Sequence, residues 1–186
     1  MSHILITGSS DGLGLMAAQR LTDQGHAVVL HARNGARANN ARTALPNATA
    51  VVTGDLSSIA QTRRVAEQAN TLGQFNAVVH NAGVGYRELR RLTEDGLEHV
   101  FAINVLAPYL LTALIGRLKR LISLSSGMHR SGEPRLDDLQ WTARPWNGAQ
   151  AYADSKLYDV MLAFGIARRW PMCCPMPWNP AGSPPR

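Results

Sequence analysis

Short apolar runs alternate along the chain with longer stretches in which apolar residues recur three and four positions apart. The short runs are almost continuously apolar, which is typical of strands that are buried on both faces of a sheet. The predicted strands are Ile4–Thr7, Ala27–His31, Ala50–Thr53, Ala77–His80 and Leu121–Leu124. The amphipathic stretches predict helices over Leu13–Gln24, Ala36–Leu45, Ser58–Leu72, Glu94–Leu118 and Ala151–Trp170.

Strands and helices alternate at a spacing that requires right-handed crossovers between parallel strands. We therefore predict one α/β domain over residues 1–170, with a doubly wound parallel sheet between two helical layers. Thr93 is the expected N-cap of the fourth helix, because Glu94 and Asp95 would then lie in its first turn, near the positive end of the helix dipole.

Two segments depart from this alternation. Gly127–Gln150 is long, polar and irregular, and a long loop inside a compact domain is usually functional or disordered. Residues 171–186 contain six of the ten prolines and show no hydrophobic period. Since proline cannot donate to a sheet ladder, we expect an irregular tail that is a poor central strand. The strand Leu121–Leu124 would then lie at an exposed sheet edge.

A glycine-rich turn joins the first predicted strand to the first helix. Thr7–Gly14 places glycines at positions 8, 12 and 14. Glycine allows a tight turn and a close approach of the backbone to a ligand, and the N-terminus of the following helix offers unpaired N–H groups to a pyrophosphate. An ordinary turn is the alternative, but the order of strand, spaced glycines and helix favours nucleotide binding in a Rossmann-type fold.

The residue expected to select the cofactor follows the second strand. NAD-binding folds place an acidic residue about 20 positions after the glycines, where it holds the ribose 2′-hydroxyl. Arg33 stands in this region instead, and a guanidinium can bind a 2′-phosphate through two parallel hydrogen bonds. A solvated arginine in an arginine-rich chain is the alternative. We favour NADP over NAD as the cofactor.

Tyr152 and Lys156 are four residues apart in the last predicted helix, so their side chains share one face. A tyrosine with an ordinary pKa of about 10 is a poor base at neutral pH, but a nearby ammonium and an oxidised nicotinamide both favour the phenolate. Tyr152 can then act as an acid in reduction and as a base in oxidation. This spacing arises by chance on many helices, and its location after the fifth strand gives it weight.

These residues resemble the motifs of the short-chain dehydrogenase/reductase family. Thr7–Gly14 is similar to its glycine motif, Asn81–Gly83 to its Asn-Ala-Gly motif, and residues 152–156 to its Tyr-x-x-Ser-Lys motif. The resemblance implies hydride transfer between NADP(H) and a carbonyl or alcohol. The implied catalytic residues are Asn104, Ser126, Tyr152 and Lys156, with Ser125 as the alternative serine. The implied cofactor-binding residues are Gly8, Ser9, Ser10, Gly12, Leu13, Gly14, Arg33, Asp55, Leu56, Asn81, Ala82, Gly83, Tyr152 and Lys156.

The resemblance also implies individual roles. Ser126 would hydrogen-bond the substrate oxygen, Asn104 would hold a water of the proton relay, and the pair Asp55 and Leu56 would contact adenine. Members of the family commonly pair the helices that correspond to Glu94–Leu118 and Ala151–Trp170 between subunits. A homodimer or homotetramer is therefore expected.

The interval from Ser126 to Tyr152 resembles the insert of retinol-dehydrogenase-like and protochlorophyllide-reductase-like members of the family. That resemblance implies an apolar carbonyl or alcohol substrate, by analogy alone. Trp141 and Trp146 in this segment can line a substrate pocket or anchor the loop, and the sequence favours neither role.

The resemblance extends from Ile4 to about Trp170 and then stops, so we expect a chain that is truncated or frameshifted at this point. If the codons for residues 172–182 are regrouped one base earlier, they permit Asp-Val-Leu-Ser-Asn-Ala-Leu-Glu-Pro-Gly-Trp, in which Val, Leu, Ala and Glu are forced. Family members show a strand followed by Pro-Gly here. A natural frameshift and a sequence error both fit this observation. A cofactor-binding protein with little or no turnover is therefore the alternative function.

Composition excludes some other functions. The net charge is +6, but the arginines are dispersed and no recognition motif accompanies them, which argues against a nucleic-acid-binding domain. The two cysteines are adjacent, and no metal-ligand spacing is present, so no metal is expected. No stretch approaches the roughly 20 apolar residues of a membrane span, and the N-terminus reads as a buried strand, not as a signal peptide. We expect a cytoplasmic location.

Overall fold

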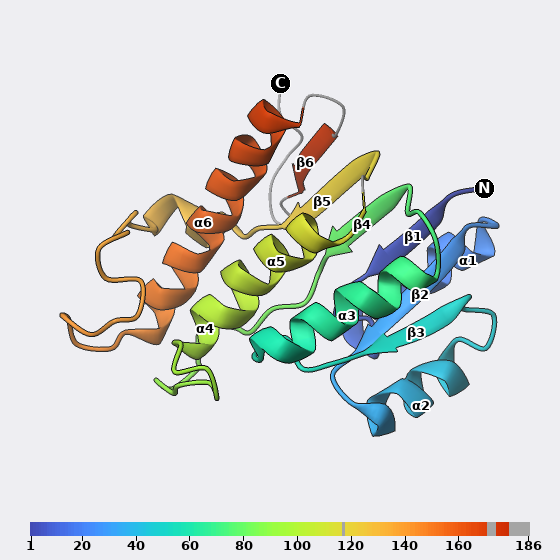
Figure 1. Cartoon of the computed structure of the whole chain (residues 1–186). Helices are drawn as coiled ribbons and strands as arrows, with labels where there is room; N and C mark the ends of the chain where they lie inside the picture. Colours follow the sequence, from blue (N-terminus) through green and yellow to red (C-terminus); the bar gives the residue numbers. More distant parts are fainter. Residues whose placement is uncertain (117, 171–173, 179–186) are drawn as a thin grey trace.

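A six-stranded parallel sheet forms the centre of the computed structural model, which describes residues 1–116, 118–170 and 174–178 (Figure 1). The strands are β1 (His3–Ile6), β2 (Ala27–Ala32), β3 (Ala50–Thr53), β4 (Ala77–His80), β5 (Arg120–Leu124) and β6 (Cys174–Trp178). Their order is β3-β2-β1-β4-β5-β6, and every neighbouring pair is parallel. The order reverses between β1 and β4, and sheets of this type bind ligands at the carboxyl ends of the strands beside that reversal.

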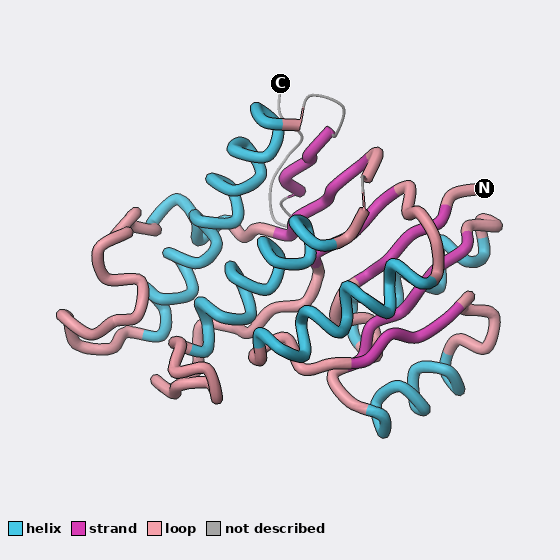
Figure 2. Tube along the Cα trace, viewed as in Figure 1, coloured by secondary structure: helices cyan, strands magenta, loops and turns pink. Residues whose placement is uncertain are grey.

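Helices cover both faces of the sheet, as the alternation of strands and helices predicts (Figure 1). One layer contains α1 (Gly12–Asp23) and α2 (Gly35–Ala44), and the other contains α3 (Ile59–Thr71), α5 (Ala107–Leu114) and α6 (Gly148–Arg169). Figure 2 shows that α4 (His99–Phe101), the π-helical turn η1 (Ala102–Leu106) and α5 follow one another in a continuous helical rod. The Rossmann-type, three-layer fold is confirmed. None of the described helices is long and apolar enough to cross a bilayer.

Adjacent residues at the centres of β1 and β2 point into different hydrophobic clusters, which explains why both faces of these strands are apolar there. Leu5 and Val29 pack with residues of α3 and α5 in one cluster. Ile6 and Leu30 pack with residues of α1 and α2 in the other. All four side chains are fully buried, and each such burial contributes about 1.5–3 kcal/mol. The sheet is therefore fixed between the two helical layers.

The helix predicted over Glu94–Leu118 is shorter at both ends. Thr93 is not its N-cap, because Gly96, with φ +73°, closes a turn on the Thr93 carbonyl. The helix begins after Glu98, whose buried carboxylate accepts hydrogen bonds of 2.8 Å from two first-turn N–H groups. Burial raises the pKa of this carboxyl, and the two N–H donors oppose that shift. The helix ends at Leu114, where the next residue is extended.

β6 corrects the prediction of a wholly irregular tail. Cys174–Trp178 adds to the sheet beside β5, so β5 is not an edge strand. β6 is the edge strand instead, and an edge strand has one unpaired side, where the missing N–H groups of Pro175 and Pro177 are tolerated. The remaining residues of the predicted tail, 171–173 and 179–186, lie outside the described residues.

The segment between the short 3₁₀ turn η2 (Gly127–Ser131) and α6 is irregular, as predicted, and Arg144 fastens it to α6. The Arg144 guanidinium contacts Asp138 at 3.4 Å and Asp154 of α6 at 2.9 Å, and it lies 3.6 Å from the centre of the Trp141 ring. Trp141 packs edge-on against Trp146 with 5.3 Å between ring centres. The two tryptophans therefore anchor this loop.

Candidate functional site

The glycine turn after β1 opens onto a cleft at the carboxyl ends of the strands. Gly8 and Gly12 have φ values of +60° and +54°, a region that other residues rarely adopt. A Cβ on Gly14 would lie 2.3 Å from the Gly8 carbonyl oxygen, so the turn can close only around glycine. The Asp11 side chain makes no capping hydrogen bond to α1, which leaves the first-turn N–H groups of this helix available to a ligand.

The cleft has a volume of about 390 Å³ and is bordered by this turn and by the segments that follow β2, β3 and β4. The predicted cofactor-binding residues that line it are Gly8, Ser10, Gly12, Leu13, Gly14, Arg33, Asp55, Leu56, Asn81, Ala82 and Gly83. Ser9 does not line the cleft, because its side chain is buried beneath the turn. Val84 and Ile103 also border the cleft and were not predicted.

The buried side chains of His31 and Ser9 support the glycine turn through hydrogen bonds. The role of His31 was not predicted. His31 accepts a hydrogen bond of 3.0 Å from the Gly8 N–H through Nδ1, and its Nε2 bonds to the Gly54 carbonyl at 2.9 Å. The Ser9 hydroxyl donates to the Ile6 carbonyl and accepts from the His31 N–H. Burial lowers the pKa of His31, which keeps the imidazole neutral and able to accept. A histidine at the end of an otherwise apolar strand was the signal for this role.

Two arginines border the cleft beside α2. Arg33 and Arg37 both line it, and Arg37 forms an ion pair with Asp11 of the glycine turn. The sequence pattern singled out Arg33 alone. Arg37 lies in the first turn of α2, only four positions after Arg33, and this nearness in sequence was the signal that could have found it. A phosphate bound in this corner would meet two guanidinium groups.

Asn81 and Ala82, directly after β4, fix the glycine turn from its other side. The Asn81 side-chain amide donates to the backbone carbonyls of Thr7 and Gly8, at 2.9 and 2.8 Å. Ala82 packs so closely on the turn that a Cβ on Gly8 would lie 2.8 Å from the Ala82 Cα. The turn is therefore held rigidly against the strand that leads to the other half of the site.

Gly83, the next residue, lies against two of the predicted catalytic residues. A Cβ on Gly83 would lie 3.3 Å from Asn104 Oδ1 and 3.8 Å from Lys156 Nζ. The Asn104 amide accepts a hydrogen bond from the Val84 N–H at 2.8 Å and donates to the Val84 carbonyl and the Ser155 hydroxyl. Asn104 occupies the π-helical turn η1, and such turns are frequent at functional sites.

Tyr152 and Lys156 lie on α6 one turn apart, as the spacing predicts. Lys156 Nζ is 5.9 Å from the centre of the Tyr152 ring. The same ring meets Tyr86, from the loop after β4, edge-on at 6.2 Å. Tyr152 is half-buried and Lys156 is buried, and neither of these two predicted cofactor-binding residues lines the cleft.

The two candidate serines after β5 have different surroundings. The buried Ser125 hydroxyl donates to the Lys156 carbonyl at 3.0 Å, which ties β5 to α6. Ser126 is half-buried, and its hydroxyl accepts a hydrogen bond of 3.3 Å from the Met128 N–H at the start of η2. This arrangement favours Ser126 over Ser125 as the serine that can face a substrate.

Lys156 has a partner that the sequence pattern did not single out. Its ammonium donates to Asp159 Oδ2 at 2.8 Å and to the Leu124 carbonyl at 2.9 Å. Burial raises the pKa of Asp159 to about 6, although the attraction of Lys156 opposes that shift. An acidic residue three positions after the lysine, on the same helix face, was the available signal.

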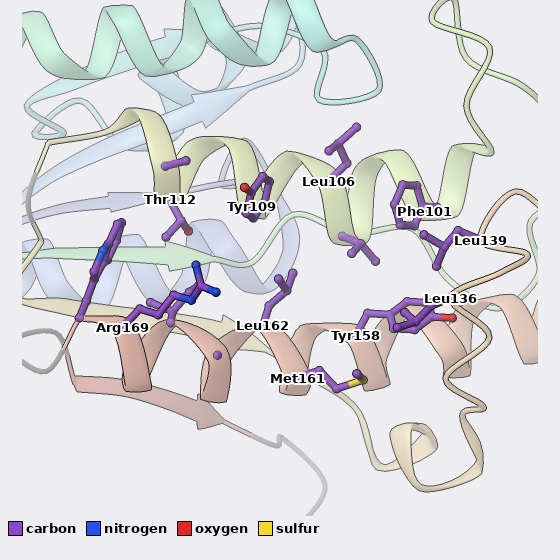
Figure 3. Close-up of a pocket in the computed structure, with 15 residues that line it drawn as sticks. Phe101, Leu106, Tyr109, Thr112, Leu136, Leu139, Tyr158, Met161, Leu162 and Arg169 are labelled. Carbon is purple, nitrogen blue, oxygen red and sulfur yellow. The ribbon is translucent and has the colours of Figure 1, made fainter.

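A larger cavity, of about 640 Å³, lies away from these residues, between α5 and α6 (Figure 3). Leu106, Tyr109 and Thr112 face it from the helical rod, and Tyr158, Met161 and Leu162 face it from α6. Leu136 and Leu139 of the long loop close one end. Its lining is almost entirely apolar, with Arg169 as the charged exception.

Relatives of known sequence share most of this chain. An uncharacterized oxidoreductase of Emericella nidulans is 49% identical over 173 residues, which are 91% of this chain and 65% of the relative. Retinol dehydrogenase 13 of Homo sapiens is 32% identical over 178 residues, 89% of this chain and 54% of the relative. The chain thus spans less than two thirds of the length of these relatives.

Solved structures agree with the fold. The crystal structure of an uncharacterized protein from Mycobacterium paratuberculosis matches with a TM-score of 0.86 at 27% identity. The match covers 96% of this chain and 67% of the Mycobacterium chain. A short-chain dehydrogenase from Sphingobium yanoikuyae, solved in complex with NADPH, matches with a TM-score of 0.70 at 21% identity. The match covers 96% of this chain and 70% of the Sphingobium chain.

The sheet order, the glycine turn and the cleft define a Rossmann-type nucleotide-binding protein. The family model described as short chain dehydrogenase matches residues 2–128. The chain belongs to the short-chain dehydrogenase/reductase family of oxidoreductases, and its relatives include retinol dehydrogenases.

Proposed function

We propose that the protein binds NADP(H) and transfers a hydride between the nicotinamide and a carbonyl or alcohol substrate, with Tyr152 as the acid and base. One chain of contacts carries this proposal: Ala82 packs on the Gly8 turn, and the next residue, Gly83, lies 3.8 Å from the ammonium of Lys156, measured from an ideal Cβ. A cofactor with its diphosphate at the turn would therefore extend toward Tyr152.

The residues of the cleft fit such a cofactor. Glycine at position 12 faces open space, since nothing lies within 4 Å of an ideal Cβ there. The first-turn N–H groups of α1 suit a diphosphate. Arg33 and Arg37 suit a 2′-phosphate, which favours NADP(H) over NAD(H).

The protein residues divide the chemistry among them. When bound, the nicotinamide supplies or accepts the hydride. Tyr152 donates the proton to the substrate oxygen in reduction and removes it in oxidation, and the nearby Lys156 ammonium stabilises the phenolate. Ser126 orients the substrate oxygen, and Asn104 fixes the loop after β4 through its bonds to Val84.

Titration of the purified chain with NADPH and NADH, followed by assay with a panel of aldehydes and ketones, tests this function. We expect tighter binding of NADPH and substrate-dependent oxidation. Tyr152→Phe should bind NADPH normally and turn over at least about 100-fold more slowly. Failure of the chain to bind either cofactor would refute the proposal. Binding without turnover would support the alternative, a cofactor-binding protein without catalysis.

We also propose that α5 and α6 pair with a second copy of the chain. Tyr109 and Met161, which line the apolar cavity of Figure 3, are 51% and 41% exposed, and Phe164 of α6 is 58% exposed. Light scattering after size-exclusion chromatography should give a dimer or tetramer, and Phe164→Glu should shift it toward the monomer. A wild-type monomer at micromolar concentration would contradict this expectation.

A further inference from the structure

Among the described residues, three elements surround the Lys156 ammonium, and Asp159 is the neighbour that carries a formal charge. α6 supplies the Asp159 carboxylate, and β5 supplies the Leu124 carbonyl. The segment after β4 supplies Gly83. Lys156 and Asp159 are 7% and 5% exposed, so water screens their interaction little.

Within the part of the chain that the structure describes, few other ionisable groups lie near this pair. Tyr152 is on the same helix, with its ring centre 5.9 Å from Lys156 Nζ, and the neighbouring Ser125, directly after β5, is neutral. Among the described residues, Lys156 is the charged group that shifts the pKa of Asp159. β6 also packs against α6, and its side chains lie outside the described residues.

We propose that Asp159 is a positioning residue and the counterion of Lys156, and that gain or loss of its proton sets the net positive charge presented to the nicotinamide and to the Tyr152 phenol. This inference rests on the proposed function. An ammonium has three N–H donors, and two of them are taken by Asp159 and Leu124. The third remains for a ligand or for Tyr152.

The two protonation states of Asp159 have different consequences for the cofactor. With Asp159 ionised, the pair is neutral overall. With Asp159 protonated, the Lys156 charge is uncompensated, and it disfavours the positively charged oxidised nicotinamide relative to the neutral reduced one. Burial places this transition near pH 6, within the working range of many enzymes.

The ratio of the dissociation constants of NADP⁺ and NADPH, measured by calorimetry from pH 5 to 8, isolates this effect. The 2′-phosphate also titrates near pH 6, but it is common to both cofactors and cancels in the ratio. In the wild type the ratio should fall about tenfold as the pH rises through about 6. In Asp159→Asn it should stay at its low-pH value throughout, and Asp159→Glu should restore the pH dependence.

Asp154→Asn is the matched control, because Asp154 is a buried acid of the same helix that bonds to Arg144 and not to Lys156. Its ratio should follow the wild-type curve. A flat wild-type ratio, or a ratio in Asp159→Asn that still falls with pH, would overturn the role of Asp159. The pH profile of turnover, where turnover is measurable, should lose the same inflection in Asp159→Asn.

A readout without cofactor separates this inference from the proposed function. Absence of binding by either cofactor would refute the proposed function alone. The carboxyl carbon of Asp159, followed by NMR in the free wild-type protein, should titrate near pH 6. Lys156→Met should move that midpoint upward, because it removes the cation that stabilises the carboxylate. A midpoint near 4, or one that Lys156→Met leaves unchanged, would overturn the pairing itself.

Discussion

The side-chain amide of Asn81 donates a hydrogen bond of 2.8 Å to the backbone carbonyl of Gly8, across 73 positions of sequence. A second bond from the same nitrogen reaches the Thr7 carbonyl at 2.9 Å, and the Thr7 hydroxyl accepts from the Asn81 N–H at 3.0 Å. The end of β4 therefore determines the shape of the turn that follows β1. The proposed diphosphate site and the Tyr152 region are mechanically connected through this contact.

Asn81→Ala should loosen the glycine turn, because two backbone carbonyls lose their donor. We expect a loss of about 1–3 kcal/mol of unfolding free energy and about tenfold weaker NADPH binding. Thermal denaturation and fluorescence titration measure the two effects. Asn40→Ala, on the exposed face of α2, is the control and should change neither quantity. Unaltered NADPH affinity in Asn81→Ala would show that the turn keeps its shape without the amide.

Gly14→Ala should abolish NADPH binding, because its Cβ would lie 2.3 Å from the Gly8 carbonyl oxygen and 2.5 Å from Asn81 Nδ2. The turn must open to admit the methyl group. Gly35→Ala, at the start of α2, is the matched control, since nothing lies within 4 Å of its ideal Cβ. We expect Gly35→Ala to bind NADPH normally and to be as stable as the wild type or slightly more stable. Equal affinity in the two variants would contradict the placement of the diphosphate.

Arg33→Ala should weaken NADPH binding about 10- to 100-fold and leave NADH binding unchanged, because a charge-assisted hydrogen bond to the 2′-phosphate is lost. Arg37→Ala should also weaken the binding of NADPH and not that of NADH, but by a smaller factor, since Arg37 is already paired with Asp11. Arg42→Ala, further along α2 and outside the cleft, is the control. Parallel losses for NADPH and NADH in Arg33→Ala would mean that Arg33 does not read the 2′-phosphate.

Arg144→Met should destabilise the protein by about 3–5 kcal/mol, because it leaves the buried carboxylates of Asp138 and Asp154 without their cation. Urea denaturation measures this cost. Arg135→Met removes an ion pair of similar length, with Glu133, but both of its partners are more than half exposed. That variant should lose less than about 1 kcal/mol. Equal losses would show that burial does not determine the contribution of these arginines.

His80 should make the protein less stable in acid. It is fully buried, and burial lowers its pKa from 6.5 to about 4. Between pH 6.5 and about 4, His80 is therefore protonated in the unfolded chain and neutral in the folded protein. The free energy of unfolding falls by about 3 kcal/mol over this range as the pH is lowered. His31 acts in the same direction, whereas the raised pKa of Asp159 acts in the opposite direction.

His80→Gln isolates this contribution. Its unfolding free energy at pH 7 should be lower than that of the wild type, because the imidazole packs beneath α5 with a hydrogen bond of 2.8 Å to Thr112. Between pH 7 and pH 4.5, however, it should lose about 2–3 kcal/mol less than the wild type. Denaturant titrations at the two pH values measure the difference. Parallel pH curves for the two proteins would contradict a neutral His80.

The local hydrophobic pattern predicted the strands well. Consecutive apolar residues such as Leu5 and Ile6 bury side chains on both faces of the sheet, and a short run of this kind is typical of a buried strand. The start of the helix at Glu98 was missed for a local reason as well: the Thr93–Gly96 turn competes with the helix that Glu94 and Asp95 suggest. β6 was missed because the suitability of a proline-containing strand depends on its place at the sheet edge, which is a tertiary property.

The site was predicted where motif residues follow strands, since parallel strands bring their carboxyl ends to one edge of the sheet. His31, Arg37 and Asp159 were missed because their roles depend on distant partners. His31 bonds to Gly8 of another strand end, Arg37 pairs with a residue 26 positions earlier, and Asp159 matters because it is buried with Lys156. No sequence window contains that information.

The π-helical turn at Ala102–Leu106 carries one residue more than an α-helix needs for the same rotation. Each residue of an α-helix advances it by about 100°. This surplus residue therefore lets Asn104 bond to Val84, which borders the cleft, while Leu111, further along the same rod, points into the hydrophobic core beside α3. Deletion of one residue within the turn would restore regular α-helical winding and leave the two ends of the rod in phase. The effect should therefore fall on the turn itself, which would lose the register that bonds Asn104 to Val84.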